Sequence, residues 1–355
     1  MNLRDPKCQN FALVREMLET PALIGKFDFQ ESRDAAAAIR QTGRLFLTGE
    51  GSSRIFPAKN LISEILRLGV PVAAATEGAR QAHEYDLSKF VVFGASNSGK
   101  TKELISLFTQ LGTRGHGGRF GLTANSPCAL ETVSDRCYTL QCGKEDAVAA
   151  TKSVVEQALF YRSLILASEP SSPLVANRQE AAEKAQEVLQ SEIEPALIQR
   201  IAEASVVYFA GRNNGVAEEI TLKTNEITRK KSDYLEGTYA VHGVEEVMSA
   251  NDVVLVFDPF PAEIEKIQTT LVDGVGMTVI AIAAQQTILP TIRIPSVEGY
   301  GSILQLLAGW NILVQVGVGL GINLDKAQRA RKIGNEFLGE STRRADQPCA
   351  SAPAR

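Results

Sequence analysis

The chain has 355 residues, of which 44% are apolar and 22% are charged, and this composition is typical of a globular protein. Its length allows two domains of ordinary size, each with a core of its own. The net charge of −4 gives no support for nucleic-acid binding, which favours a basic surface.

Strand-like and helix-like runs alternate through the first half of the chain. The predicted strands cover residues 44–49, 71–75, 90–95, 119–124 and 137–142, and the predicted helices cover 55–69, 101–112 and 150–167. A break rich in Pro and Ser at 169–173 follows, and then a charged helical stretch to about residue 203. The alternation predicts a parallel sheet covered by helices.

The second half repeats this order of elements. Its predicted strands are 206–210, 253–257, 277–283 and 291–295, and its predicted helices are 216–230, 261–272 and 301–319. The sequence therefore predicts an α/β protein built from two similar units joined by the charged helical stretch.

The segment 94–101 (GASNSGKT) lies between the strand 90–95 and the helix 101–112 and matches two kinds of phosphate loop. As G-x-x-x-x-G-K-[ST] it is a nucleotide-binding P-loop. As Ser-x-Ser-Gly-x-Thr it offers hydroxyls and amides to a single phosphate group. In both interpretations the amides at a helix start favour an anion. The corresponding place in the second half, 258–261 (DPFP), has two prolines and no hydroxyl, so we expect one anion site per chain.

A P-loop NTPase also needs an acidic residue at the end of an apolar strand to hold magnesium. Asp258 fits that pattern, but it lies in the other half of the chain. The anion loop also follows the third predicted strand rather than the first. Lys100 is equally well explained as a solvated residue of the first helical turn. An NTPase is therefore the least favoured alternative.

The numbers of cysteines and histidines limit the disulfides and metal sites that we expect in this chain. The five cysteines form no Cys-x-x-Cys pair, and an odd number argues against a disulfide framework. With three histidines in all, a histidine-rich metal site is not expected, and we predict neither a metal nor another cofactor. The first residues lack the apolar core of a signal peptide, and we identify no apolar run of membrane-spanning length. We expect a cytoplasmic protein with no membrane or nucleic-acid partner.

With these motifs the chain resembles the sugar isomerase (SIS) domain family, over roughly residues 10–333. The similarity is greatest to the double-SIS isomerase half of glucosamine-6-phosphate synthase and to its stand-alone isomerase, deaminase and deglycase relatives. The resemblance implies two tandem SIS domains, each a three-layer α/β/α unit with a parallel sheet. Its implied divisions are a helical lead-in (1–35), a first SIS domain (36–170), a connecting helix (171–203), a second SIS domain (204–335) and a tail (336–355).

The resemblance also implies the site residues. Ser53, Ser96, Asn97, Ser98 and Thr101 fall on the family's phosphate-binding positions, and Ser52, in the turn that matches the family, is expected to bind substrate. Val148 and Ala150 lie in a segment similar to its Val-Ala-Ser-Thr-Lys sugar loop, and Glu219 and Lys223 are implied to lie near the sugar. Glu226 matches the proton-transferring base, His242 the ring-opening His, and Lys332 the Lys that forms an imine with an open-chain ketose.

Several positions depart from the family pattern around the reacting end of the sugar. Ala150 replaces a Ser, Tyr239 a Glu, Val244 a Pro, and Ala327 a Pro. The positions that are expected to bind the phosphate match the family pattern. The family's glutaminase domain has no counterpart here, so glutamine-dependent synthesis is not expected.

The chemistry suits these residue types. A carboxylate such as Glu226 can move a proton between C1 and C2 of a sugar phosphate, and a His can move one between O1 and the ring oxygen at neutral pH. We predict an aldose–ketose isomerase or an amino-sugar-phosphate deaminase or deglycase. A sulfonated sugar could occupy the same loop, and a non-catalytic sugar-phosphate sensor is a further alternative. In the family the Glu and the His of one site come from different subunits, so we expect a homodimer or a higher homo-oligomer.

Overall fold

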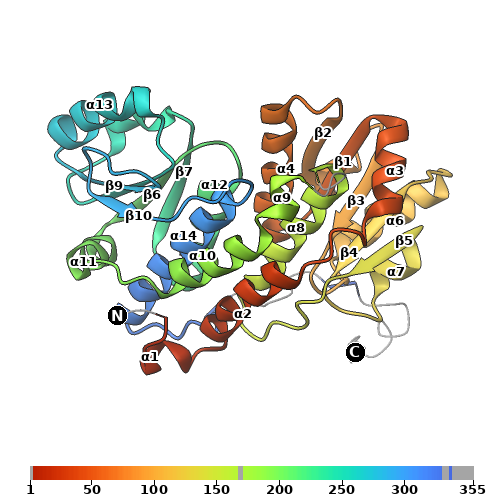
Figure 1. The fold of residues 1–355 in the computed structure, drawn as a ribbon, viewed down its shortest axis with the longest axis horizontal. Coiled ribbons are helices and arrows are strands. Elements are labelled where there is room, and N and C mark those ends of the chain that lie inside the picture. Colours follow the sequence, from red (N-terminus) through yellow and green to blue (C-terminus); the bar gives the residue numbers. More distant parts are fainter. Residues whose placement is uncertain (1–2, 167–170, 330–335, 338–355) are drawn as a thin grey trace, which may run out of the picture.

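Two five-stranded parallel sheets, one from each half of the chain, form the framework of the protein (Figure 1). The computed structural model describes residues 3–166, 171–329 and 336–337. The strand order is β2-β1-β3-β4-β5 in the first sheet and β10-β9-β8-β6-β7 in the second. Read from its other edge, the second sheet repeats the order of the first. The predicted α/β fold with two similar units is confirmed.

In the first half, buried apolar strands occupy the centre of the sheet, as expected for a parallel sheet covered on both faces. All five residues of β3 are buried. The strands are β1 (Arg44–Gly49), β2 (Ala73–Gly78), β3 (Val91–Ala95), β4 (Arg119–Thr123) and β5 (Arg136–Thr139), and the helices are α1 (Pro6–Gln9), α2 (Ala12–Lys26), α3 (Arg33–Thr42), α4 (Ile55–Leu68), α5 (Ala79–Ala82), α6 (Lys102–Thr113), α7 (Ala129–Val133) and α8 (Lys152–Leu166), with a 3-10 turn at Gly51–Ser53.

The second half contains the matching set. Its strands are β6 (Val206–Gly211), β7 (Lys231–Glu236), β8 (Val253–Phe257), β9 (Thr278–Ala283) and β10 (Thr291–Arg293). Its helices are α12 (Val216–Ile227), α13 (Ile264–Ile267), a π-helix (Gln268–Val275) and α14 (Gly301–Gly319), with 3-10 turns at Tyr239–Val241, Val244–Val247 and Pro261–Glu263. The single helix predicted over 261–272 is thus three short pieces.

Strand β7 was missed by the sequence analysis, which extended the preceding helix to residue 230. Helix α12 ends at Ile227, and Arg229 adopts a left-handed conformation (φ 57°) that turns the chain into β7. The strand reads KSDYLE and lies at the sheet edge, paired only with β6. Charged side chains are common on edge strands, where they hinder pairing with other chains, so the apolar pattern used for prediction was absent.

Strand β5 ends three residues before the predicted limit of 142. The backbone N–H groups of Gln141 and Cys142 donate to the Glu156 carboxylate at 2.8 and 2.7 Å, instead of continuing the sheet. A side chain of α8 therefore ends the strand.

The expected connecting helix at 171–203 is three helices, α9 (Pro173–Ala176), α10 (Arg178–Gln190) and α11 (Pro195–Glu203). Asn311 of α14 donates to the carbonyls of Val188 and Ser191, both at 3.0 Å, which caps the end of α10. Pro195 then begins α11, where its missing N–H costs nothing. In Figure 1, α10 and α14 run between the two sheets, and α2 lies alongside α10.

Helix α14 corrects the expectation that no apolar run is long enough to span a membrane. It has 19 residues and passes that test by length and composition, but 78% of the apolar window is buried inside the protein. Trp310 at its centre is fully buried, and Ile220 of α12 packs against Gly309. The helix therefore serves as part of the core.

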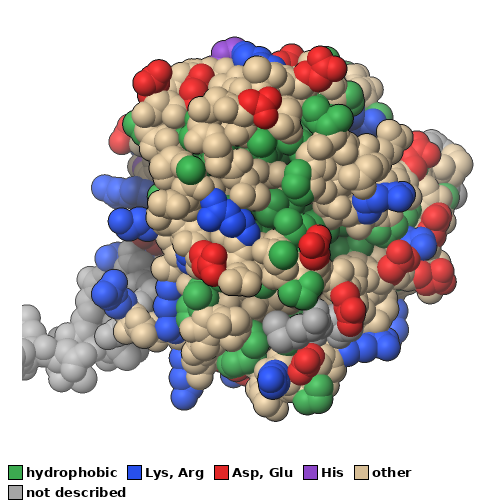
Figure 2. Space-filling view, turned by 90° about the vertical axis from the view of Figure 1, so that its left-hand side faces the viewer, with side chains coloured by type: hydrophobic (Ala, Val, Ile, Leu, Met, Phe, Trp, Pro, Cys, Tyr) green, Lys and Arg blue, Asp and Glu red, His purple; other side chains and the backbone are tan. Residues whose placement is uncertain are grey.

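Figure 2 shows the face of the second half of the chain. Acidic and basic side chains are interspersed across it, with hydrophobic side chains between them. Several Lys and Arg side chains lie close together along the left-hand edge of this view.

Candidate active site

The predicted anion loop connects β3 to α6. The hydroxyl oxygens of Ser96 and Thr101 lie 2.8 Å apart, and those of Ser96 and Ser98 lie 3.5 Å apart, so three hydroxyls converge at the start of the helix. Thr101 precedes the first residue of α6. Hydroxyls and free amide groups at a helix N-terminus form a natural site for an anion.

The P-loop alternative finds no support in this geometry. Asp258 at the end of β8 belongs to the other sheet, and its carboxylate accepts a 2.5 Å hydrogen bond from Nε of Arg212. Lys100 is exposed. The acidic residue that an NTPase would need near its magnesium ion is therefore paired elsewhere.

A buried carboxylate holds the anion loop against a second loop. Glu145, 1% exposed, accepts hydrogen bonds from the Asn97 amide at 2.7 Å, from the Ser153 hydroxyl at 2.5 Å and from the Thr151 backbone N–H at 2.7 Å. The amide of Asn97 also donates to Ser153 at 2.7 Å. Glu145 thus fixes the anion loop relative to the segment that contains Val148 and Ala150.

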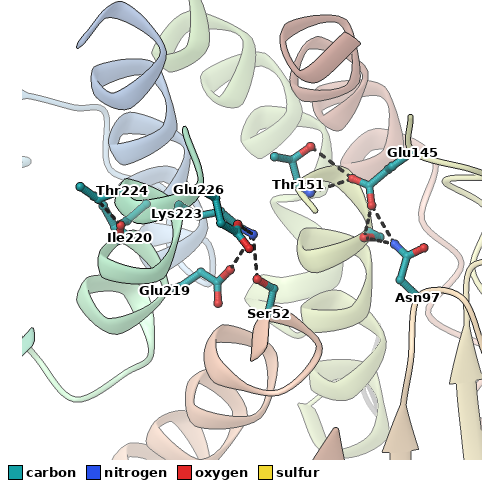
Figure 3. A network of polar contacts seen from close by, with 10 residues as sticks. Ser52, Asn97, Glu145, Thr151, Glu219, Ile220, Lys223, Thr224 and Glu226 are labelled. Atoms are coloured by element: carbon teal, nitrogen blue, oxygen red, sulfur yellow. Dashed lines mark hydrogen bonds and ion pairs between the residues drawn. The ribbon is translucent and has the colours of Figure 1, made fainter. Parts of the chain in front are cut away.

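A second network comes from α12 and the turn after β1 (Figure 3). The ammonium group of Lys223 donates to Ser52 Oγ at 2.8 Å and to a carboxylate oxygen of Glu226 at 2.7 Å, and it lies 3.6 Å from Glu219. The spacings i, i+4 and i, i+3 place the three charged residues on one face of the helix. Ser52 belongs to the first half of the chain, so this network joins the two halves.

Burial and the neighbouring charges act in opposite directions on the pKa values of Glu219 and Lys223. The side chains of Lys223 and Glu219 are 1% and 0% exposed, whereas that of Glu226 is 30% exposed. Burial raises the pKa of Glu219, against the pull of Lys223. Burial would lower the pKa of Lys223, but the carboxylates of Glu226 and Glu219 outweigh it and the pKa is raised. The structure therefore holds a charged ammonium beside Glu226.

Both networks open onto one cleft of about 700 Å³. Glu226 lines the cleft, as do nine of the ten residues predicted to bind substrate: Ser52, Ser53, Ser96, Asn97, Ser98, Thr101, Val148, Ala150 and Lys223. The tenth, Glu219, is buried behind Lys223 and does not line the cleft. The cleft thus holds hydroxyls for an anion on one side and a carboxylate–ammonium pair on the other.

His242 does not line this cleft. It follows the 3-10 turn Tyr239–Val241 beyond β7 and is exposed, as are Tyr239 (53%) and Val247 (76%) beside it. Within one chain, the structure therefore does not bring His242 to the site of Glu226. Lys332 lies outside the described residues.

The sequence analysis missed other residues of the cleft wall, including Glu145, Asn125 and Glu50. Asn125 donates to the carbonyl of Asn97 at 2.7 Å and so supports the anion loop. The later segment 336–337 also reaches this loop, because the N–H of Phe337 donates to the carbonyl of Lys100 at 2.8 Å. These contacts join residues far apart in the chain, so no local pattern indicated them.

No protein-family model and no curated protein matches this sequence. Solved structures do resemble it. Tagatose-6-phosphate ketose/aldose isomerase from Escherichia coli superposes with a TM-score of 0.72 at 18% identity, covering 91% of this chain and 98% of the isomerase. Glucosamine-6-phosphate deaminase from Thermotoga maritima gives 0.69 at 19% identity, covering 90% and 98%.

A third similar structure is the C-terminal domain of glucosamine-fructose-6-phosphate aminotransferase from Francisella tularensis. Its TM-score is 0.68 at 16% identity, over 89% of this chain and 98% of that domain. The protein has the double-SIS fold. At these identities the likeness concerns the fold, and the SIS resemblance noted in the sequence is confirmed at that level.

Proposed function

We propose that this double-SIS protein is a sugar-phosphate isomerase or an amino-sugar-phosphate deaminase or deglycase that transfers a proton between C1 and C2. One observation carries the proposal: the convergent hydroxyls of the anion loop and the carboxylate of Glu226 open onto the same cleft. The names of the solved structures, an isomerase and a deaminase of sugar 6-phosphates, support the same class.

In this proposal Ser96, Ser98 and Thr101 bind the phosphate, and the sugar extends toward α12. Glu226 takes the proton from one carbon and returns it to the other, as one partly exposed carboxylate can. Lys223 holds the Glu226 carboxylate in place through its 2.7 Å hydrogen bond. Lys223 is a positioning residue in this scheme, since its ammonium is already engaged with Ser52 and Glu226.

The ring-opening group comes from a second subunit in this proposal. His242 and its exposed neighbours Tyr239 and Val247 lie outside the cleft of their own chain. A homodimer that packs this surface against the partner's cleft would bring His242 to that cleft. A site divided in this way requires an oligomer for activity.

The test is proton exchange in deuterated water with a panel of phosphorylated hexoses, hexosamines and fructosyl-amino acids. The wild-type protein should incorporate deuterium at C1 or C2 of one class of substrate, and release of ammonia or an amino acid would distinguish the deaminase and deglycase from the isomerase. Glu226→Gln should abolish exchange while binding is retained. Glu265→Gln, at an exposed position of α13 outside the cleft, is the matched control. Exchange that persists in Glu226→Gln would assign the base elsewhere.

A further inference from the structure

Two carbonyl groups of the anion loop accept hydrogen bonds from segments behind the loop. The carbonyl of Asn97 accepts from the N–H of Ala124 at 3.1 Å. The carbonyl of Gly99 accepts from the N–H of Leu130 at 3.0 Å. Neither Ala124 nor Leu130 lines the cleft. Because the N–H of a trans peptide points opposite to the preceding carbonyl, the N–H groups that follow these carbonyls face away from the supporting segments. Backbone anion sites have this arrangement.

The carbonyl of Lys100 is held by a segment from the far end of the chain. It accepts a 2.8 Å hydrogen bond from the N–H of Phe337, and Glu336 forms an antiparallel bridge with Thr101. Glu336 and Phe337 are exposed, and neither lines the cleft. This segment therefore supports the anion loop from outside the cleft, as Leu130 does from another side.

The pattern of the bridge determines where the N–H of Thr101 points. The hydrogen bond joins Lys100, which precedes Thr101, to Phe337, which follows Glu336. Thr101 and Glu336 are therefore a non-hydrogen-bonded pair, and their own N–H groups point away from each other's strand. In the part of the chain that the structure describes, the Thr101 N–H has no acceptor. Since Thr101 lines the cleft, this N–H lies on the cleft side of the loop.

Other N–H groups of the loop are used within it. The N–H of Gly99 donates to the carbonyl of Ser96 at 3.0 Å, and the N–H of Lys100 donates to Ser98 Oγ at 3.2 Å. The N–H of Thr101 follows them at the start of α6, where the helix dipole favours an anion. The Thr101 hydroxyl lies 2.8 Å from that of Ser96. Thr101 thus offers a backbone donor beside the hydroxyls that converge at the anion site.

We propose that the backbone N–H of Phe337 positions the N–H of Thr101 as a donor to the bound phosphate. It holds the Lys100 carbonyl and with it the orientation of the peptide that carries the Thr101 N–H. Phe337 is a positioning residue, because it touches no part of the cleft. It acts through its backbone, since its side chain is 40% exposed. The inference rests on the anion site of the proposed function and not on the proposed reaction.

The origin of this contact distinguishes it from the other supports of the loop. Ala124 and Leu130 belong to the same half of the chain as the loop, whereas Phe337 follows the second half. The later part of the chain therefore contributes to the anion end of the cleft, in addition to supplying Glu226 at the other end.

The test separates the N–H of Phe337 from its side chain. Phe337→Pro removes the N–H, and Phe337→Ala keeps it and removes the ring, so the alanine variant is the matched control. A proline at 337 favours an extended conformation at Glu336, which agrees with the bridge. Each protein is prepared with isotope-labelled threonine and titrated with inorganic phosphate, and NMR spectra follow the threonine N–H groups. The Thr101 resonance is assigned by its loss in Thr101→Ser.

In the wild type and in Phe337→Ala, we expect phosphate to shift the Thr101 resonance with the same dissociation constant. In Phe337→Pro the dissociation constant should rise about tenfold, as for the loss of one hydrogen bond to a charged group, and the shift at saturation should be smaller. The urea midpoints of the three proteins should agree, because residue 337 is exposed.

Four results would overturn the inference: equal binding by Phe337→Pro and the wild type, equal weakening in Phe337→Ala, a wild-type Thr101 resonance that saturating phosphate does not move, or weak binding by Phe337→Pro together with a clearly lower urea midpoint. A wild-type protein that binds no phosphate would overturn both this inference and the anion site. Phosphate binding with the expected Thr101 response, but no proton exchange with any substrate of the panel, would remove the proposed reaction alone.

Discussion

The ammonium group of Lys223 lies 2.7 Å from a carboxylate oxygen of Glu226 and 2.8 Å from the hydroxyl of Ser52, which belongs to the other half of the chain. This buried cation therefore connects the proposed base to the turn after β1. Its removal has consequences for both stability and chemistry.

Replacing Lys223 by Met should leave Glu219 buried without a nearby counter-charge. Breaking a buried pair in this way costs about 3–5 kcal/mol of the free energy of unfolding. The double variant Glu219→Gln/Lys223→Met should regain much of that loss, because neither charge is then buried alone. Urea unfolding of the four proteins of this cycle measures the coupling. Simply additive effects would show that the two groups do not compensate each other.

Ser96→Ala/Ser98→Ala should weaken binding of a sugar phosphate. Each hydrogen bond to a charged oxygen contributes about 1.5–3 kcal/mol, so the dissociation constant should rise by at least about a hundredfold. Isothermal titration with the substrate found in the exchange panel measures it. Ser205→Ala, an exposed position in the second half, serves as the control. Unchanged affinity in the double variant would move the anion site away from this loop.

Gly99→Ala should destabilise the protein more than Gly115→Ala does. Both glycines have positive φ, 64° and 73°, so both variants pay the backbone cost, but only at Gly99 does the new Cβ overlap the sulfur of Cys128. The overlap should cost about 1–3 kcal/mol more, as overpacking typically does. Thermal or urea unfolding compares the two, and adding Cys128→Ala to Gly99→Ala should recover part of the difference. Equal losses at the two glycines would contradict the steric argument.

Mixing inactive Glu226→Gln and His242→Ala proteins should restore activity if the site is divided between subunits. After random exchange of subunits, half of the dimers are mixed and each has one intact site, so about one quarter of the wild-type activity is expected. Glu226→Gln mixed with Lys223→Met is the control, since both changes affect the same network. Absence of any recovery, with subunit exchange verified, would place His242 outside the partner's site.

The sequence predicted those parts of the site that depend on neighbouring residues. The hydroxyls of Ser96, Ser98 and Thr101 are close in the chain, and the strand before them and the helix after them determine where they meet. Glu219, Lys223 and Glu226 lie on one helix, but the sequence analysis placed them at the sugar only through the resemblance to the SIS family.

The rest depends on contacts between distant segments. Glu145 is an ordinary charged residue in the sequence, and only the folded chain brings it to Asn97. Strand β7 carries charges because it is an edge strand, so its pattern resembled a loop. The sequence analysis predicted α14 as a helix but overlooked that it is apolar enough to span a membrane, a composition that a helix buried on all sides also has.

The seam between the two halves has a consequence for folding. Ser52 comes from one half, and Lys223 and Glu226 come from the other, so the cleft exists only while α4 and α12 remain in contact. The ion pair between Lys59 of α4 and Glu218 of α12 joins the same two helices. A ligand that contacts both Ser52 and Glu226 stabilises the packing of the two halves by its binding free energy. Saturation with such a ligand should therefore raise the midpoint of unfolding of the docked halves.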